Sequence, residues 1–230
     1  FEEEGETDGP KSISNSEFFI KLGQRMIRSL NEVTKDGFVF RVDMRLRPHG
    51  DEGALALSFY AAELYYTTLG REWERYALVK ARVIAGDQQA GARLLHLLKP
   101  FVYRKYLDFG AFAQLRDMKK AIEREMSRRG MHDNIKLGPG GIREIEFIGQ
   151  LFQLLRGGRE PKLQSRRILR TLAVLSDLHE LPSTVVEELL SGYDFLRRTE
   201  NRLQMMHDCQ TQTLPLDPRD QARLALAMGY

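Results

Sequence analysis

Residues 38–47 read FVFRVDMRLR, and the alternation of apolar and other side chains along this stretch predicts a β-strand. Side chains in a strand point alternately to the two faces of a sheet. One face would then be wholly apolar, with Phe38, Phe40, Val42, Met44 and Leu46. The other face would carry one aspartate among three arginines, with Val39, Arg41, Asp43, Arg45 and Arg47. Pro48 and Gly50 end the strand.

The charges on the second face repel one another. Side chains two residues apart on a strand lie about 7 Å apart, where two like charges repel by roughly 2.4 kcal/mol at an effective dielectric constant of 20. Asp43 can relieve the repulsion between Arg41 and Arg45, but Arg45 and Arg47 remain adjacent. If this face lines a cleft, we expect an anion there: phosphate, a nucleotide or a carboxylate from elsewhere. The alternative is a solvated sheet face, with acidic cross-strand partners neutralising the arginines.

The composition narrows the class of protein. The chain has 230 residues, 42% of them hydrophobic, which is enough for a sizeable core in one or two domains. Its 35 basic and 32 acidic residues give a net charge of only +3, which argues against a nucleic-acid partner. The single cysteine, Cys209, excludes an internal disulfide. No apolar run approaches the ~20 residues of a membrane span. We therefore expect a cytoplasmic protein that binds no membrane.

The rest of the sequence predicts mostly helices. A small α/β part is expected up to about residue 92, followed by an all-helical part. Helical periodicity and capping residues place the helices at about 16–30, 58–69, 71–84, 87–99, 112–129, 141–157, 165–181 and 183–207, with a short helix at the end.

A second group of charges lies on the helix GGIREIEFIGQLFQLL, which follows a glycine cluster at 138–141. This helix is apolar on most of its circumference, so it is expected to be buried and its polar stripe must meet partners. Arg143 and Glu146 could face a cleft at the helix N-terminus, where the dipole and free amides favour anions. Alternatively, they form a structural pair at i, i+3. The glycines are not a P-loop, because the Lys-Ser/Thr pair is absent.

The stretch WERYALVKAR at 73–82 leaves a similar choice. Glu74, Lys80 and Arg82 could face a site, whereas a solvated helix face is the simpler interpretation of each charge. His49 and His132 lie in loops without the spacing of metal ligands, so we expect no zinc site.

Four motifs together resemble one family. They are VDMRLRPHGDEGAL at 42–55, WERYALVKAR at 73–82, IKLGPGGIREIEF at 135–147 and RGGREPKLQSR at 156–166. Their order and spacing are similar to those of the glutamine synthetase adenylyltransferase/adenylyl-removing enzymes, over essentially the whole chain. These enzymes are large, two-headed nucleotidyltransferases of the polymerase-beta type.

The resemblance implies a fold and a reaction. The fold is α+β and mostly α overall: the C-terminal part of an incomplete polymerase-beta-type nucleotidyltransferase domain at 1–92, then a helical bundle domain at 93–230. The GGIREIEF form is similar to the N-terminal half of the family, which implies adenylyl removal. In that reaction, phosphate attacks the AMP on a tyrosine of glutamine synthetase and releases ADP. The implied cofactor is Mg²⁺, and the implied partners are glutamine synthetase, the PII signal protein, phosphate, ADP and ATP.

The resemblance also implies roles for single residues. Asp43 matches the third carboxylate of the family's catalytic pattern, and it is therefore expected to be catalytic and to bind the metal. The Gly-Ser motif and Asp-x-Asp pair of that pattern do not occur here, and we expect them immediately before Phe1, so that the isolated chain should be inactive. Arg45 and Arg47 would be catalytic, because they would hold phosphate. Five further residues would bind the nucleotide: Glu74, Lys80, Arg82, Arg143 and Glu146.

Two alternatives stay open. The same fold could add AMP to glutamine synthetase from ATP, or the helical part could be a non-catalytic docking or regulatory module.

Overall fold

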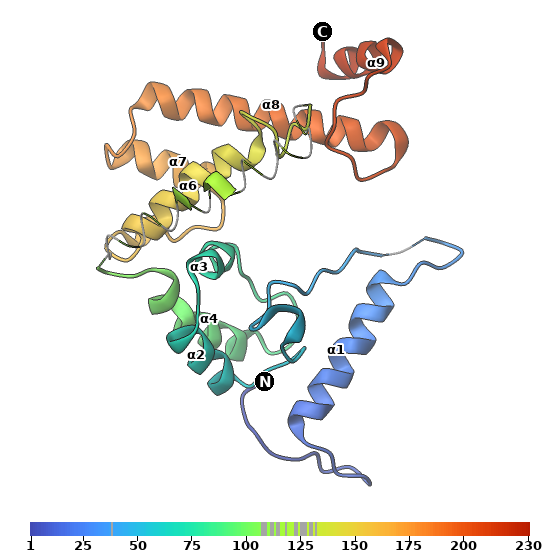
Figure 1. Ribbon diagram of the computed structural model, residues 1–230, viewed down its shortest axis with the longest axis vertical. Coiled ribbons are helices and arrows are strands. Elements are labelled where there is room, and N and C mark those ends of the chain that lie inside the picture. The colour runs from blue at the N-terminus through green and yellow to red at the C-terminus, as the bar shows by residue number, and fades with distance from the viewer. Residues whose placement is uncertain are drawn as a thin grey trace. The chain divides into compact units, whose positions relative to one another are not determined.

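The computed structural model describes residues 1–37, 39–106 and 133–230, together with residues 110, 113, 116, 117, 119–121, 124, 128 and 131 (Figure 1). These residues divide into two compact units, Phe1–Val102 and Tyr103–Tyr230. The predicted helix at 112–129 lies largely outside the described residues, as does His132.

The predicted boundary between residues 92 and 93 falls inside a helix, α4 (Gln88–Val102). Because that helix packs as one element against its neighbours, the first unit extends to its end. The assignment of the two parts as a catalytic domain and a bundle domain stays a prediction.

Helices of the first unit begin at the kind of polar caps that the sequence predicts. The hydroxyl of Ser58 accepts a hydrogen bond from the amide of Ala61 at 3.2 Å and starts α2, while Ser14, next to the predicted cap, does the same for α1. The elements of this unit are α1 (Asn15–Asn31), the 3₁₀ turn η1 (Gly50–Glu52), α2 (Phe59–Thr68), α3 (Glu72–Leu78) and α4.

The predicted strand at 38–47 is wrong for residues 39–47, the part that the structure describes. The amides of Val39 and Phe40 both donate to the carbonyl of Leu30, at 3.1 and 2.8 Å, so they hold the chain to the end of α1. A strand forms only where a neighbouring segment supplies the other side of the ladder. In the described parts of the chain, β pairing is limited to isolated bridges, Glu6–Ser14, Thr34–Gly37 and Asn134–Thr213.

The prediction of a mostly α chain is confirmed, whereas the incomplete polymerase-beta-type domain stays a prediction. None of the described helices is both long and apolar enough to cross a membrane.

The core of the first unit lies where α2 and α3 pack against α4. Arg75 of α3 is fully buried there, and its Nε and Nη2 donate to the carbonyl of Val102 at 3.2 and 3.1 Å. Its Nη1 binds Glu72. Arg75 thus satisfies a carbonyl at the C-terminal end of α4. The sequence predicted that this helix stops before Pro100, but it continues to Val102.

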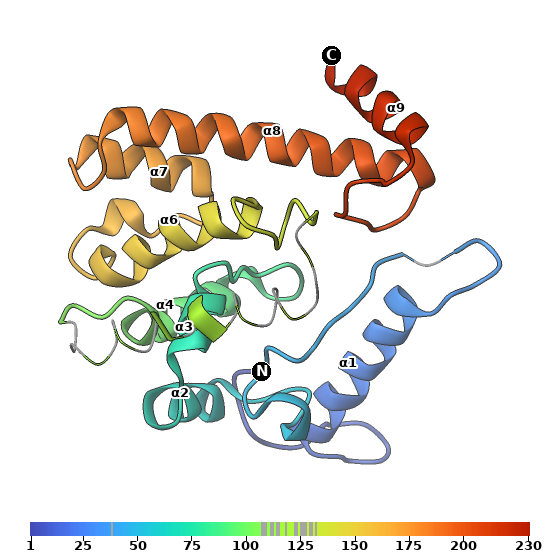
Figure 2. The same cartoon turned by 45° about the horizontal axis from the view of Figure 1, so that its top comes forward.

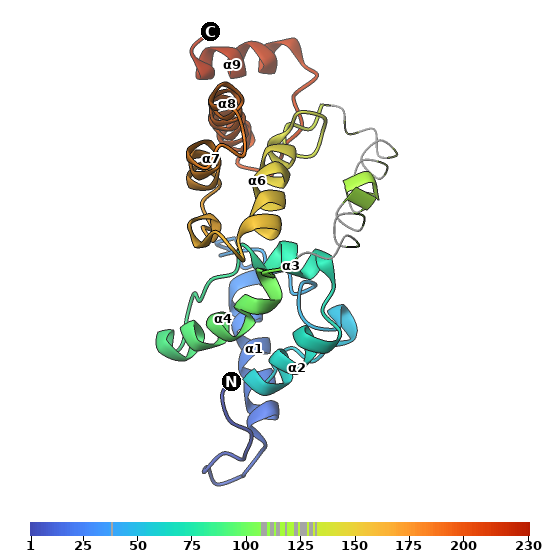
Figure 3. The same cartoon turned by 90° about the vertical axis from the view of Figure 1, so that its left-hand side faces the viewer.

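The second unit is a helical bundle. Figures 2 and 3 show α6, α7 and α8 packed side by side, with α9 against one end of α8. Its core is apolar and draws on several of these elements, with Ile145, Leu163, Ile168, Leu172, Leu175 and Val186. The elements are α6 (Ile142–Arg156), the 3₁₀ turn η2 (Pro161–Leu163), α7 (Ile168–Asp177), α8 (Ser183–His207) and α9 (Pro218–Met228).

Candidate functional site

Asp43 and Arg45 form a charged pair in the first unit, within residues 41–53, here called the signature loop. The Nη2 of Arg45 lies 2.6 Å from Oδ2 of Asp43, and its Nε lies 3.0 Å from both carboxylate oxygens. The backbone amide of Arg45 also donates to Oδ1 at 3.0 Å. The two side chains are 49% and 74% exposed, respectively. The predicted catalytic carboxylate is therefore held by its near neighbour, in an open loop.

The hydrogen bonds from Arg45 lower the pKa of Asp43 to about 2, the side-chain bonds first and the backbone bond second. The same side-chain bonds raise the pKa of Arg45. Asp43 is consequently ionised at any physiological pH. Because the pair is solvent-exposed, water screens it, and it contributes little to the stability of the loop.

Arg47 holds the signature loop in its folded shape. Its Nη1, Nη2 and Nε donate to the carbonyls of Met44, Asp51 and Gly53, at 2.7, 3.0 and 3.1 Å. The carboxylate of Asp51 lies 3.6 Å away. Three of the five N–H donors of a guanidinium are thus used by the loop backbone. The predicted role of Arg47 in holding phosphate stays a prediction.

Glu74 has structural contacts. It is buried, and its carboxylate accepts hydrogen bonds from the hydroxyl of Tyr65 and the amide of Arg71, both at 2.8 Å. It therefore caps the N-terminus of α3. Lys80 and Arg82 follow the end of that helix, and Arg82 is exposed. The predicted nucleotide contacts of these three residues stay predictions.

The second candidate region is residues 134–146, here called the loop–helix motif. The amides of Ile142 and Arg143 donate to carbonyls of the preceding loop, both at 3.0 Å, and the amide of Gly140 donates to the carboxylate of Glu144 at 2.9 Å. The N-terminus of α6 is therefore closed by its own loop. The alternative in which free amides favour an anion there is therefore wrong, whereas the predicted nucleotide contacts of Arg143 and Glu146 stay predictions.

The loop of this motif is itself held in place at both ends. The buried side chain of Asn134 accepts hydrogen bonds from the amides of Lys136 and Leu137, at 3.1 and 2.8 Å. At the helix start, a Cβ on Gly141 would lie only 2.8 to 2.9 Å from three loop carbonyls. Only glycine fits this position, because backbone atoms cannot swing aside as a flexible side chain can.

Glu146 pairs with α8 and not with Arg143, so the predicted i, i+3 pair is wrong. Its carboxylate accepts a hydrogen bond from the hydroxyl of Tyr193 at 3.1 Å and lies 3.4 Å from Nη2 of Arg197. Arg197 also binds Glu200 at 2.7 Å. Arg143 is exposed.

Glu146, Tyr193, Arg197 and Glu200 form a polar cluster, which also reaches the loop of the loop–helix motif. Lys136 places its Nζ 3.3 Å from the other carboxylate oxygen of Glu200, whose side chain is only 6% exposed. Burial raises the pKa of Tyr193. Lys136, Tyr193, Arg197 and Glu200 were all missed by the sequence analysis. For Arg197 and Glu200, the signal that the sequence offered was the presence of charged residues in the predicted helix at 183–207.

The described residues do not fit a complete magnesium site. Among them, no group of three or more His, Cys, Asp or Glu side chains gathers where a metal ion could bind. Mg²⁺ requires six oxygen ligands in near-octahedral geometry. Asp43 offers one carboxylate, which is bonded to Arg45. Its role as a metal ligand stays a prediction.

Two protein-family models match the chain, one on each side of the division between the units. The model described as glutamate-ammonia ligase adenylyltransferase matches residues 1–97. The model described as GlnD PII-uridylyltransferase matches residues 116–230, which is half of the chain.

Curated relatives match the chain from end to end. A protein of Thioalkalivibrio sulfidiphilus is 58% identical over 226 residues, which are 98% of this chain and 23% of the relative. Proteins of Pseudomonas putida and Nitrosococcus oceani are 59% and 58% identical over 231 positions, 100% of this chain and 24% of each relative. All three are named bifunctional glutamine synthetase adenylyltransferase/adenylyl-removing enzyme. The chain thus spans about a quarter of the length of these relatives.

Proposed function

The chain belongs to the family of bifunctional glutamine synthetase adenylyltransferase/adenylyl-removing enzymes, and we propose that it contributes to removing AMP from glutamine synthetase. Phosphate attacks the phosphorus of the AMP group, and the bond to the tyrosine oxygen breaks. ADP leaves, and the tyrosine regains its proton. The partners in this proposal are adenylylated glutamine synthetase, phosphate and ADP.

The observation that carries the proposal is the 58–59% identity to these enzymes over 98–100% of the chain. The signature loop supplies an ionised carboxylate, Asp43, beside guanidinium groups. Arg45 is 74% exposed, so its side chain has room to leave Asp43 and bind a phosphate oxygen. A guanidinium suits this task, because its planar fork matches an oxyanion.

Enzymes of this type generally use a divalent metal ion. In our proposal the ion is Mg²⁺, which would neutralise the phosphate oxygens. Asp43 would be one of its ligands, and the others would come from outside the described residues.

The proposal is tested by Asp43→Asn in the complete enzyme that contains this chain. Phosphate-dependent release of AMP from adenylylated glutamine synthetase should fall by about two orders of magnitude or more, because an amide cannot replace a metal-binding carboxylate. Glu52→Gln is the matched control, since that carboxylate lies in the same loop and is exposed. Normal AMP release by Asp43→Asn would refute the proposed role.

A second candidate reaction adds AMP instead of removing it: the tyrosine oxygen of glutamine synthetase attacks the α-phosphorus of ATP, and pyrophosphate leaves. It is favoured by the description of the model that matches residues 1–97, which names an adenylyltransferase. Incubating the complete enzyme with ATP and unmodified glutamine synthetase distinguishes the two. If Asp43→Asn abolishes AMP incorporation and leaves AMP release intact, this chain belongs to the adding half.

A third candidate concerns the second unit alone, as a docking or regulatory module. The match of residues 116–230 to a PII-uridylyltransferase model favours the PII signal protein as its partner. Binding of PII to the complete enzyme, compared before and after deletion of residues 103–230, tests this candidate. Unchanged binding would count against it.

A further inference from the structure

The arginines of α8 fall into two groups. Arg197 is turned into the bundle, where Glu146 and Glu200 neutralise it. Arg198 and Arg202 lie on the outside, and both are exposed. Within the parts of the chain that the structure describes, neither lies within 4.0 Å of a carboxylate, and the one contact of Arg202 is with the sulfur of Met205 at 3.8 Å.

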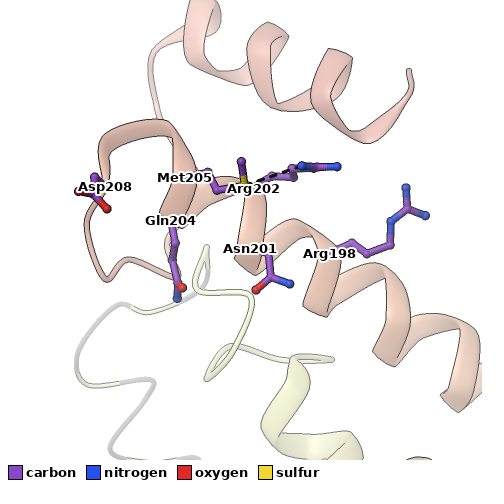
Figure 4. Close-up of a pocket in the computed structure, with 6 residues that line it drawn as sticks. All are labelled: Arg198, Asn201, Arg202, Gln204, Met205 and Asp208. Atoms are coloured by element: carbon purple, nitrogen blue, oxygen red, sulfur yellow. Dashed lines mark hydrogen bonds between the residues drawn. The ribbon is translucent and has the colours of Figure 1, made fainter. Parts of the chain in front are cut away.

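These two outward arginines border an open pocket of about 550 Å³. Arg198 and Arg202 are four residues apart on one helix, so they share a face and repel each other. Figure 4 shows both guanidinium groups extending in the same direction from α8, with Asn201 between them along the helix. The described residues that line the pocket are Arg198, Asn201, Arg202, Gln204, Met205 and Asp208. An anion placed between the two guanidinium groups would relieve this repulsion.

The occupant is better explained as a protein segment than as a small molecule. The lining residues that the structure describes all come from one stretch of chain, 198–208, so they form a single wall on one side of α8. Small-molecule sites usually enclose most of the ligand surface, which one helix face cannot do. A protein partner brings the opposite wall with it.

The residue types around the two arginines are those of a protein interface. Phe195 and Met205 flank them along the helix and are 46% and 69% exposed. Aromatic residues, methionine and arginine are enriched where proteins bind each other, whereas lysine and glutamate are depleted. The exposed charge between Phe195 and Met205 is positive, so the complementary partner is acidic with apolar anchors.

We propose that this face of α8, from Phe195 to Met205, binds an acidic segment of the enzyme's protein substrate, with Arg198 and Arg202 pairing with its carboxylates. The proposal rests on the proposed function, which makes that substrate glutamine synthetase. Neither arginine takes part in the chemical step. They hold the protein substrate, so they affect its affinity and not the reaction at phosphorus.

The test is the double variant Arg198→Glu/Arg202→Glu in the complete enzyme. Two substrates are compared, adenylylated glutamine synthetase and a short peptide carrying AMP on tyrosine. The KM for the protein substrate should rise about tenfold or more, because like charges now face each other, and kcat should stay the same. Turnover of the peptide should not change. In the unaltered enzyme the KM for the protein should increase with salt, whereas in the double variant salt should lower the KM, because it then screens a repulsion.

The matched control is Arg170→Glu/Arg219→Glu, which makes the same change of charge at exposed positions of α7 and α9. This control should leave KM and kcat unchanged for both substrates. The milder Arg198→Gln/Arg202→Gln should give a smaller rise in KM, and thermal melting should verify that each variant folds.

An unchanged KM for the protein substrate would overturn the proposal. Equal losses on protein and peptide would overturn it as well, since the face would then serve the nucleotide or be covered by another part of the enzyme. If the complete enzyme only adds AMP, the proposed function fails by itself. The same variants are then compared on the KM for unmodified glutamine synthetase, so the two failures are distinguishable.

Discussion

The signature loop and the loop–helix motif both place charges among apolar residues, yet one is open and the other is closed. In the signature loop, Asp43 and Arg45 pair in solvent. In the loop–helix motif, Glu146 is bonded to two side chains of another helix. The difference follows from the backbone. A helix satisfies its own amides and then offers a face for packing, whereas an extended segment depends on a partner from elsewhere in the chain.

The apolar side chains show the same contrast. Phe40 and Leu46, which would form the inner face of a strand, are 66% and 64% exposed. Ile142, at the start of α6, is 0% exposed. The predictions below test how far the two regions differ.

The largest expected effect comes from breaking the closed motif at Gly141. Gly141→Ala should lower the free energy of unfolding by about 3 kcal/mol, because the new methyl group meets three backbone carbonyls. In the signature loop, Gly53→Ala brings a Cβ to 2.0 Å from the carbonyl of Pro48, but the loop buries little apolar surface, with Leu46 64% exposed, so its rearrangement should lower the free energy of unfolding by less. Urea denaturation measures both.

Gly9→Ala is the neutral control, since nothing lies within 4 Å of its added Cβ. If Gly53→Ala lowers the free energy of unfolding more than Gly141→Ala does, the signature loop contributes more to stability than this comparison predicts.

The next effect is expected from Glu200→Ala, which removes the acid shared by Arg197 and Lys136. The free energy of unfolding should fall by about 2 kcal/mol. This is less than for a fully buried pair, because the side chains of Arg197 and Lys136 are about 40% exposed and remain hydrated. In the open loop, Asp43→Ala should leave the denaturation midpoint unchanged. Equal losses of unfolding free energy for Glu200→Ala and Asp43→Ala would contradict the difference between the closed motif and the open loop.

A smaller effect is expected from Tyr193→Phe, which deletes the hydroxyl that donates to Glu146 and accepts from Arg197. The loss should be about 1 kcal/mol, the usual net value of a partly buried hydrogen bond. Because Tyr193→Phe keeps the ring, thermal melting of this variant reports the hydroxyl alone. A melting temperature equal to that of the original chain would show that Glu146 is held by Arg197 without help.

The smallest effect concerns protonation of the signature loop. Arg45→Gln should raise the pKa of Asp43 from about 2 toward the ordinary 3.8, since the side-chain hydrogen bonds from Arg45 are the main cause of the shift. A depressed folded pKa contributes to stability above pH 3.8, and this contribution, which solvent screening keeps small here, is lost as the pH falls toward 2. Carboxyl NMR titration measures the shift. A pKa unaffected by Arg45→Gln would contradict the pairing.

The sequence predicted helices better than it predicted the charged regions. The start of α2 at Ser58 and the ranges of α6 and α8 follow from local signals, namely caps, glycines and helical periodicity. The strand at 38–47 could not be judged locally, because its alternation says nothing about whether a partner strand is present.

The partners of Glu146 were also beyond the sequence analysis. Tyr193 and Arg197 are 47 and 51 residues away along the chain, and only packing of α8 against α6 brings them close. Arg75 lay in a motif that was recognised, but nothing local indicates that its guanidinium reaches a carbonyl 27 residues away.

Hydrogen exchange of the chain tests the contrast between the two regions most directly. Within the part of the chain that the structure describes, the amides of Arg41 and Asp43 donate no hydrogen bond, whereas those of α6 are bonded within a helix. The amides at 41 and 43 should therefore exchange at nearly the rate of an unfolded chain, and the amides at 145–154 should exchange at least about a hundredfold more slowly. Comparable protection of the two regions would contradict the account.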